Sequence, residues 1–139
     1  MKSADVDQPL GYLLNRVATA LRTEVTGLVL DPLGLAFPEY ICMRLLSHSP
    51  GISNAELARS ANVSRQAMNL VVRELQERGL VTRPASVASG RSRPTELTPA
   101  GTELLARTDA GLVEAERHVL AKLSPQDRRE FRRLLAALA

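Results

Sequence analysis

Apolar and polar residues recur at helical spacing through most of the chain, and the pattern is densest in residues 51–81. Ser53 and Glu56 have the spacing of a capping box, so we expect a short helix to begin just after Ser53. Asn62 tolerates the left-handed backbone of a sharp turn, and Ser64 is suited to cap a second helix. Two short helices joined by such a turn predict a helix-turn-helix.

The second of these helices has two chemically different faces. Its apolar residues are expected to face inward, and Gly79 is expected to end it. These inward residues are Met68, Val71, Val72 and Leu75. The outward residues are Arg65, Gln66, Asn69, Leu70 and Arg73. Gln and Asn can each bond an adenine edge in two places, and Arg can do the same for guanine, so this face suits base reading in the major groove. The alternative is a plain solvated helix face.

The segment that follows has the composition of a β-hairpin wing. Residues 80–83 and 95–98 are predicted strands, and the stretch between them is rich in Pro, Ser, Gly and Arg. The basic residues of this wing are Arg83, Arg91 and Arg93. A basic loop beside a recognition helix would reach phosphates or an adjacent minor groove. An ordinary surface hairpin also carries arginines, and this alternative stays open.

Amphipathic helices are predicted on both sides of this segment. Residues 8–30 carry one apolar stripe, made of Leu10, Leu14, Val17, Leu21, Val25 and Leu28. Thr98 and Pro99 are typical of a helix start, and a long helix is expected from there to about Leu123. The last helix starts at Ser124 and has the stripe Phe131, Leu134, Leu135 and Leu138. The first helix of the same or another chain is the expected cover for this stripe.

A basic run lies beside the last stripe. It consists of Arg128, Arg129, Arg132 and Arg133. Charge on an exposed helix usually forms a solvated face that complements the helix dipole, and we expect that here. A direct contact with phosphate is the alternative.

The order of these elements, with several short motifs, resembles the MarR family of winged-helix transcription regulators. The motifs are Leu-Gly-Leu-x-x-Pro-Glu-Tyr at 33–40, Leu-Ala-x-x-x-x-Val-Ser at 57–64, Val-x-Arg-Glu-Leu at 71–75, Arg-Gly-Leu-Val at 78–81 and Leu-Thr-x-x-Gly at 97–101. The family wing usually has an acidic residue just before its basic tip, where this chain has Ser89. The pattern is similar to a subgroup of actinobacterial repressors that respond to small aromatic acids.

The resemblance implies a mainly α fold: a winged helix-turn-helix with a small β-hairpin wing and N- and C-terminal dimerisation helices. The divisions expected are 1–34 for the N-terminal dimerisation helix, 35–98 for the DNA-binding domain and 99–139 for the C-terminal dimerisation helices. The resemblance also implies a homodimeric repressor that binds double-stranded DNA at a near-palindromic operator with half-sites about 10 bp apart. The contacts expected are bases for Gln66, Asn69 and Arg65, phosphates for Ser64 and Arg73, and the wing contact for Arg91 and Arg93, beside Arg83.

In MarR-like proteins, ligands bind between the dimerisation helices and the winged helix. The polar and aromatic candidates near that junction are Tyr12, Arg16, Phe37, Tyr40, Met43, Arg44 and His48. An arginine beside aromatic rings suits a salicylate-like aromatic acid, because the guanidinium bonds the carboxylate in a fork and the ring stacks. The alternative is that these residues belong to the core, the dimer interface or structural ion pairs.

Two other hypotheses stay open. Some MarR-like proteins sense oxidants through cysteine, and Cys42 would serve here, although a cysteine among apolar residues is usually a buried, unreactive group. A winged helix can also contact another protein. The outward face of the second helix argues against that use, because a protein-binding face should carry exposed aromatic side chains and this one has none.

Composition agrees with a regulator. The chain has 139 residues, 45% of them hydrophobic and only 3% aromatic, which allows one domain with an aliphatic core. Its net charge is +3, and residues 53–97 carry 7 Arg against 4 Glu, so the positive excess lies on the predicted DNA-binding segment.

Other classes of protein are disfavoured. One cysteine excludes an intrachain disulfide, and the scattered Cys42, His48 and His118 predict no metal site or cofactor. The sequence has no Ser-His-Asp arrangement, phosphate-binding loop or paired carboxylates, so we do not expect an enzyme. No stretch is long and apolar enough for a membrane and no signal peptide is recognisable, so we expect a cytoplasmic protein.

Overall fold

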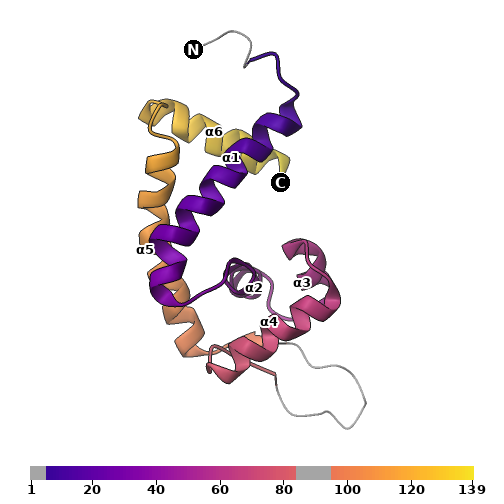
Figure 1. The fold of residues 1–139 in the computed structure, drawn as a ribbon. Coiled ribbons are helices and arrows are strands. Elements are labelled where there is room, and N and C mark those ends of the chain that lie inside the picture. Colours follow the sequence, from indigo (N-terminus) through magenta and orange to yellow (C-terminus); the bar gives the residue numbers. More distant parts are fainter. Residues whose placement is uncertain (1–5, 84–94) are drawn as a thin grey trace.

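The computed structural model describes residues 6–83 and 95–139, and it is mainly helical (Figure 1). A short two-stranded hairpin accompanies the helices. The main elements are α1 (Leu10–Val25), α2 (Phe37–His48), α3 (Asn54–Ala61), α4 (Arg65–Glu77), β1 (Val81–Thr82), β2 (Glu96–Leu97), α5 (Pro99–Val119) and α6 (Pro125–Leu138). The two strands are antiparallel, with Val81 opposite Leu97. The predicted mainly α, winged helix-turn-helix architecture is confirmed, with strands shorter than expected.

The first helical segment changes its winding before it ends. α1 passes into a π-helical turn, η2 (Thr26–Leu30), and then into a 3₁₀ turn, η3 (Asp31–Leu33). Gly34 follows with φ +67°, a left-handed conformation that glycine adopts without strain. Beyond it the chain turns by 87° into α2. Among the described residues, no single helix is long and apolar enough to cross a membrane.

The core surrounds α2, which lies between the α1–α5 pair and the α3–α4 pair (Figure 1). The largest fully buried side chains are Leu30, Met43, Leu57, Met68, Leu75, Val72, Thr108 and Cys42. Burying each of the larger aliphatic ones contributes about 1.5–3 kcal/mol. Since α3 and α4 both contribute to this core, the helix-turn-helix is held rigidly on α2.

The helix-turn-helix has the caps that its sequence predicts. Ser53 Oγ accepts from the Glu56 N–H at 3.1 Å, which is one of the two bonds of a capping box. Asn62 is left-handed at φ 56°, and Ser64 Oγ accepts from the Ala67 N–H at 3.0 Å. Gly79 has φ +72° just beyond α4, as expected for a residue that ends a helix.

A tight corner joins the end of α4 to the start of α5. The Thr98 hydroxyl donates to the Gly79 carbonyl at 2.6 Å and accepts from the Gly101 N–H at 3.1 Å, so it caps α5 while bonding the chain that leaves α4. A Cβ on Gly101 would collide with the Leu80 carbonyl oxygen. The Leu-Thr-x-x-Gly motif therefore fixes the start of α5 against the recognition-helix segment.

The C-terminal part departs from the sequence expectation at one point. α5 ends at Val119 rather than near Leu123, because the backbone closes a turn from the Leu123 N–H to the Leu120 carbonyl. Ser124 Oγ then caps α6 by accepting from the Asp127 N–H at 3.0 Å. Within one chain α6 has no buried residue, and Leu138 at its end is 82% exposed. Its apolar stripe is therefore left largely uncovered by the protomer itself.

Candidate nucleic-acid interface and effector junction

The outer face of α4 is a continuous exposed surface. Met68 and Leu75 are wholly buried beneath it, and the residues that face solvent are Arg65, Gln66, Asn69, Leu70 and Arg73. This is the division of faces that the apolar spacing predicts. The side chains at the start of α4 are free to enter a groove, and their individual contacts with DNA stay predictions.

Two of the contact residues predicted on the helix-turn-helix have partners within the chain. The Ser64 hydroxyl oxygen accepts the capping bond, which leaves its O–H available to donate to a phosphate. The Asn69 Oδ1 accepts from Asn54 Nδ2 at 2.7 Å, across the turn of the helix-turn-helix. This bond leaves the amide hydrogens and the second lone pair of the Asn69 oxygen for a two-point contact with adenine.

The wing is described only at its base. Arg83 is exposed just beyond β1, and its Nε donates to Thr95 Oγ1 at 3.4 Å, across the hairpin. Arg91 and Arg93, predicted to contact DNA from the wing, lie outside the described residues, as does Ser89.

Aromatic rings and guanidinium groups gather where α1, α2 and α5 meet; we call this cluster of Arg22, Phe37, Tyr40, Arg44 and Asp109 the effector junction. Phe37 and Tyr40 pack with ring centroids 6.1 Å apart and planes tilted by 56°. The Arg22 guanidinium lies 4.6 Å from the Phe37 centroid, and that of Arg44 lies 5.4 Å from the Tyr40 centroid. Two cations therefore flank one aromatic pair, an arrangement suited to a flat, negatively charged ring.

Arg44 is the most constrained member of the junction. Its Nη2 lies 3.3 Å from the Tyr40 hydroxyl and also forms an ion pair with Asp109 of α5. Burial alone would lower the pKa of Arg44, but hydrogen bonds with Asp109 and Tyr40 outweigh it and the pKa is raised. Arg44 is therefore a permanent cation whose charge faces an acidic partner on another helix.

The structure brings together only part of the predicted ligand set: Phe37, Tyr40 and Arg44. Met43 is fully buried in the core, and its place in a ligand pocket stays a prediction. His48 is exposed at the last residue of α2. Tyr12 and Arg16 contact each other on the exposed half of α1, with Arg16 5.8 Å from the ring centroid. They lie about 9–15 Å along the helix from Arg22.

Two members of the junction were missed from the sequence. Arg22 lies on the same helix as Arg16, and only the folded structure shows which arginine meets Phe37. Asp109 is separated from Arg44 by 65 residues. No local sequence motif identifies either residue. The only sequence signal for Asp109 is that it is an acidic residue on the helix that follows the wing.

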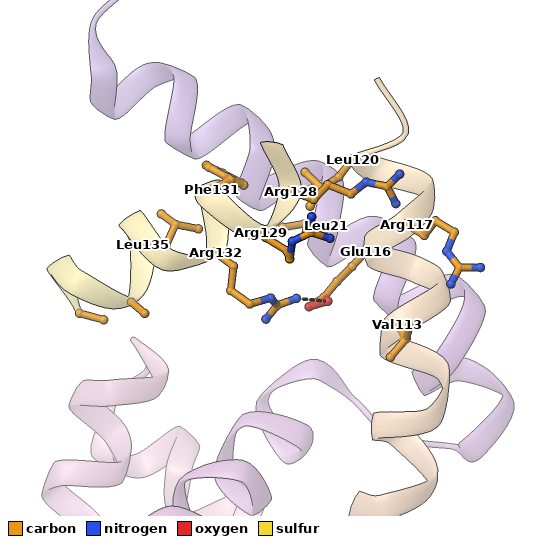
Figure 2. Close-up of a pocket in the computed structure, with 12 residues that line it drawn as sticks. Leu21, Val113, Glu116, Arg117, Leu120, Arg128, Arg129, Phe131, Arg132 and Leu135 are labelled. Atoms are coloured by element: carbon orange, nitrogen blue, oxygen red, sulfur yellow. Dashed lines mark hydrogen bonds and ion pairs between the residues drawn. The ribbon is translucent and has the colours of Figure 1, made fainter. Parts of the chain in front are cut away.

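A separate hollow of about 480 Å³ lies between α1, α5 and α6 (Figure 2). Its lining is mostly apolar with four arginines, and Arg132 Nη2 is bonded to Glu116 Oε2 at 2.8 Å. The residues that line it are Leu21, Val113, Glu116, Arg117, Leu120, Arg128, Arg129, Phe131, Arg132, Leu135, Ala136 and Ala139. The predicted ligand residues are not among them, so this hollow and the effector junction are different places.

The basic run on α6 is mostly engaged within the chain. Besides Arg132, Arg133 pairs with Glu130 one turn earlier, and Arg128 Nε donates to the Leu123 carbonyl at 3.2 Å. These bonds agree with the expected solvated face that stabilises its own helix.

Cys42 is enclosed on the core side of α2. It is 0% exposed, and burial together with the negative charge of Glu39 raises the pKa of the thiol to about 12. A thiol that stays protonated at neutral pH is a poor nucleophile, so its environment argues against the oxidant-sensor hypothesis.

The fold and its exposed, capped second helix define a winged helix-turn-helix protein. A model of the MarR family matches residues 36–92. The HTH-type transcriptional repressor Rv2887 of Mycobacterium tuberculosis is 54% identical over 132 residues, which are 95% of this chain and 94% of Rv2887. The chain therefore belongs to the MarR family, whose proteins are dimeric.

Solved structures agree with this assignment. The crystal structure of Rv2887 in complex with salicylic acid matches with a TM-score of 0.83 and 53% identity, covering 96% of this chain and 98% of that one. The structure of Rv2887 in complex with DNA matches with a TM-score of 0.80 and 48% identity, covering 96% and 99%.

Proposed function

We propose that the chain is a homodimeric, sequence-specific DNA-binding repressor that a small aromatic acid releases from its operator. The observation that carries the proposal is the exposed polar face of α4, held on a rigid core with a capped N-terminus. Its similarity to a repressor solved with DNA and with salicylic acid supports it. In this proposal residues 1–34 and 99–139 dimerise, residues 35–98 bind DNA, and the protein works in the cytoplasm as a regulator rather than an enzyme.

The DNA contacts are divided between specificity and affinity. Gln66, Arg65 and Asn69 read bases, because they project from the first turns of α4. Ser64 and Arg73 hold phosphates, and Arg91 and Arg93 supply the wing contact. Base readers govern the preference for one sequence, whereas phosphate contacts strengthen binding to all sequences.

The test is binding to a labelled duplex from the upstream region of the protein's own gene, at two salt concentrations with random-duplex competitor. Gln66→Ala should cost about 1–3 kcal/mol on the operator and little on random DNA. Arg73→Ala should weaken both alike and flatten the salt dependence. Arg133→Ala, on α6, is the charge-matched control. Equal losses on both DNAs for Gln66→Ala would overturn the base-reading role.

The effector is proposed to bind at the effector junction, with its ring beside Phe37 and Tyr40 and its carboxylate near Arg22 and Arg44. Salicylate should release DNA from the wild-type protein, and Arg22→Ala should weaken that release without weakening DNA binding itself. Arg16→Ala tests the other arginine of α1. If only Arg16→Ala impairs release, the site includes the exposed half of α1 rather than Arg22.

The dimer interface is proposed to include the hollow between α1, α5 and α6. Phe131 and Leu135 line it, and a second copy of the chain would bury them. Leu135→Glu should give a monomeric mass in sedimentation equilibrium at micromolar concentration. Leu70→Glu is the matched control, because Leu70 is an exposed leucine on the DNA-binding face. A wild-type monomer at that concentration would refute the dimer.

A further inference from the structure

The ion pair of Arg44 and Asp109 connects two parts of the molecule. Arg44 lies on α2, which packs against the recognition helix α4. Asp109 lies near the middle of α5, which packs against α1 in the proposed dimerisation scaffold. The pair therefore joins the DNA-binding lobe to the scaffold through two charged side chains.

The same guanidinium is the group that an aromatic carboxylate would seek. Tyr40, whose ring is proposed to contact the effector, also holds Arg44 through its hydroxyl, with Arg44 Nε at 3.4 Å and Nη2 at 3.3 Å. In the structure Nη2 already has a carboxylate partner, Asp109. An effector carboxylate placed beside Tyr40 would therefore meet a guanidinium that carries an acidic partner.

The two sides of the pair differ in their contact with water. The Arg44 side chain is 26% exposed, whereas that of Asp109 is 50% exposed. Arg44 also contacts the Tyr40 ring and hydroxyl, so it has a second partner on its own helix besides Asp109. Asp109 can return to water at little cost, because a half-exposed carboxylate keeps much of its hydration in the pair.

We propose that Asp109 is an internal competitor of the effector, and that an aromatic acid binds by replacing the Asp109 carboxylate on Arg44. This inference rests on the proposed effector site. Two carboxylates beside one guanidinium repel each other, so binding of the second drives out the first, more hydrated one. The exchange breaks the ion pair between α2 and α5, which otherwise stay packed, and so links effector binding to movement of the DNA-binding lobe. It also explains how the site would select an acid over a neutral ring.

The test compares the affinity for salicylate with that for salicylamide, in which a neutral amide replaces the carboxylate. Both are titrated calorimetrically into the full-length wild-type protein and into Asp109→Asn. Removing the competitor should tighten salicylate binding by about two- to fivefold, the range that a partly exposed ion pair supports. Salicylamide affinity should stay unchanged, because a neutral ligand does not take the place of the carboxylate.

Separate controls test whether a change in affinity comes from the loss of any negative charge or from partial unfolding of the variant. Glu130→Gln removes one negative charge from the α6 pair with Arg133 and should leave both affinities unchanged. Asp109→Ala should repeat the gain, and thermal unfolding should verify that each variant is folded. As a second readout, Asp109→Asn should need a lower salicylate concentration to release operator DNA.

The outcomes distinguish a failure of the competition hypothesis from a failure of the proposed effector site. If wild-type protein binds salicylate and Asp109→Asn binds it with the same affinity, the competition is refuted while the effector site stands. The competition is also refuted if Glu130→Gln gives an equal gain, or if salicylamide binding tightens too. If neither the wild-type protein nor Asp109→Asn binds salicylate, the effector class and the competition are both overturned.

Discussion

Arg78, the residue that follows α4, donates a hydrogen bond from Nη1 to the carbonyl oxygen of Gly34, 2.7 Å away. Its Nη2 lies 3.3 Å from the Leu33 carbonyl, and its Nη1 lies 3.8 Å from Glu39 Oε2. The other oxygen of Glu39 accepts from the Ala36 N–H at 2.8 Å, at the start of α2. The end of the recognition helix is therefore fastened to the turn that connects the first helical segment to α2.

Arg78→Ala should lower the free energy of unfolding by about 2 kcal/mol, because it removes charge-assisted bonds and leaves the buried Glu39 without its cationic partner. Urea denaturation at fixed protein concentration measures this change. Arg133→Ala, which loses only an exposed pair within α6, should stay within about 0.5 kcal/mol of wild type. Equal stabilities of the two variants would show that the Arg78 bonds contribute nothing.

Gly101→Ala should destabilise the protein by about 1–3 kcal/mol, because its Cβ would collide with the Leu80 carbonyl and force the α4–α5 corner apart. Alanine is intrinsically the better helix former by about 1 kcal/mol, so a loss of stability requires the collision to dominate. Gly11→Ala is the control: a Cβ at Gly11 meets nothing within 4 Å among the described residues, and stability should hold or rise. A Gly101→Ala variant as stable as wild type would exclude the close contact.

His118 should make stability depend on pH. Its Nδ1 lies 2.9 Å from Glu24 of α1 and its Nε2 lies 3.2 Å from Glu114, whose other oxygen pairs with Arg117. The hydrogen bond to Glu24 and the two negative charges raise the pKa of His118 above its ordinary 6.5. A raised pKa stabilises the folded state below pH 6.5, and this contribution is lost as pH rises through the raised value.

The measurement is the melting temperature from about pH 6 to about pH 8, for wild type and for His118→Gln. The wild-type melting temperature should fall more over this range than that of the variant, by a modest amount because His118 is half exposed. An NMR titration gives the pKa directly, and Glu24→Gln should lower it. If the melting temperatures of wild type and His118→Gln fall equally with pH, the His118 ion pair does not cause the pH dependence of stability.

Cys42 should resist alkylation in the folded protein. With its pKa raised to about 12 and its side chain enclosed, the thiol should not react with iodoacetamide at neutral pH until the chain unfolds. Mass spectrometry with and without urea measures this difference. Peroxide should accordingly leave DNA binding intact in both wild type and Cys42→Ser. Rapid labelling of the folded protein would revive the oxidant-sensor hypothesis.

The sequence predicts best what depends on neighbouring residues. The Ser53 and Ser64 caps, the left-handed Asn62 and the two faces of α4 all follow from local spacing, and the structure confirms them. The expected helix at 8–30 is less simple, because apolar periodicity does not show where an α-helix widens into a π-turn. The base, phosphate and wing contacts stay predictions, because they depend on the shape and sequence of the DNA as well as on the chain.

The sequence does not predict contacts between residues that are far apart in the chain. Arg44 meets Asp109, and Arg78 meets Gly34, only because α2 lies between the scaffold and the recognition helix. An amphipathic pattern shows which side of a helix faces inward, but not which partner it meets. For the same reason the sequence does not show that Met43 and Arg44, neighbours on α2, differ in their surroundings: the first fills the core and the second reaches α5.

The hollow between α1, α5 and α6 has a consequence for the amount of protein in a cell. If a second chain completes this hollow, as proposed, the active species depends on the square of chain concentration when protein is scarce. Operator occupancy would then rise steeply around a threshold copy number. Substitutions in the apolar lining, such as at Leu135, would shift that threshold while leaving the recognised sequence unchanged.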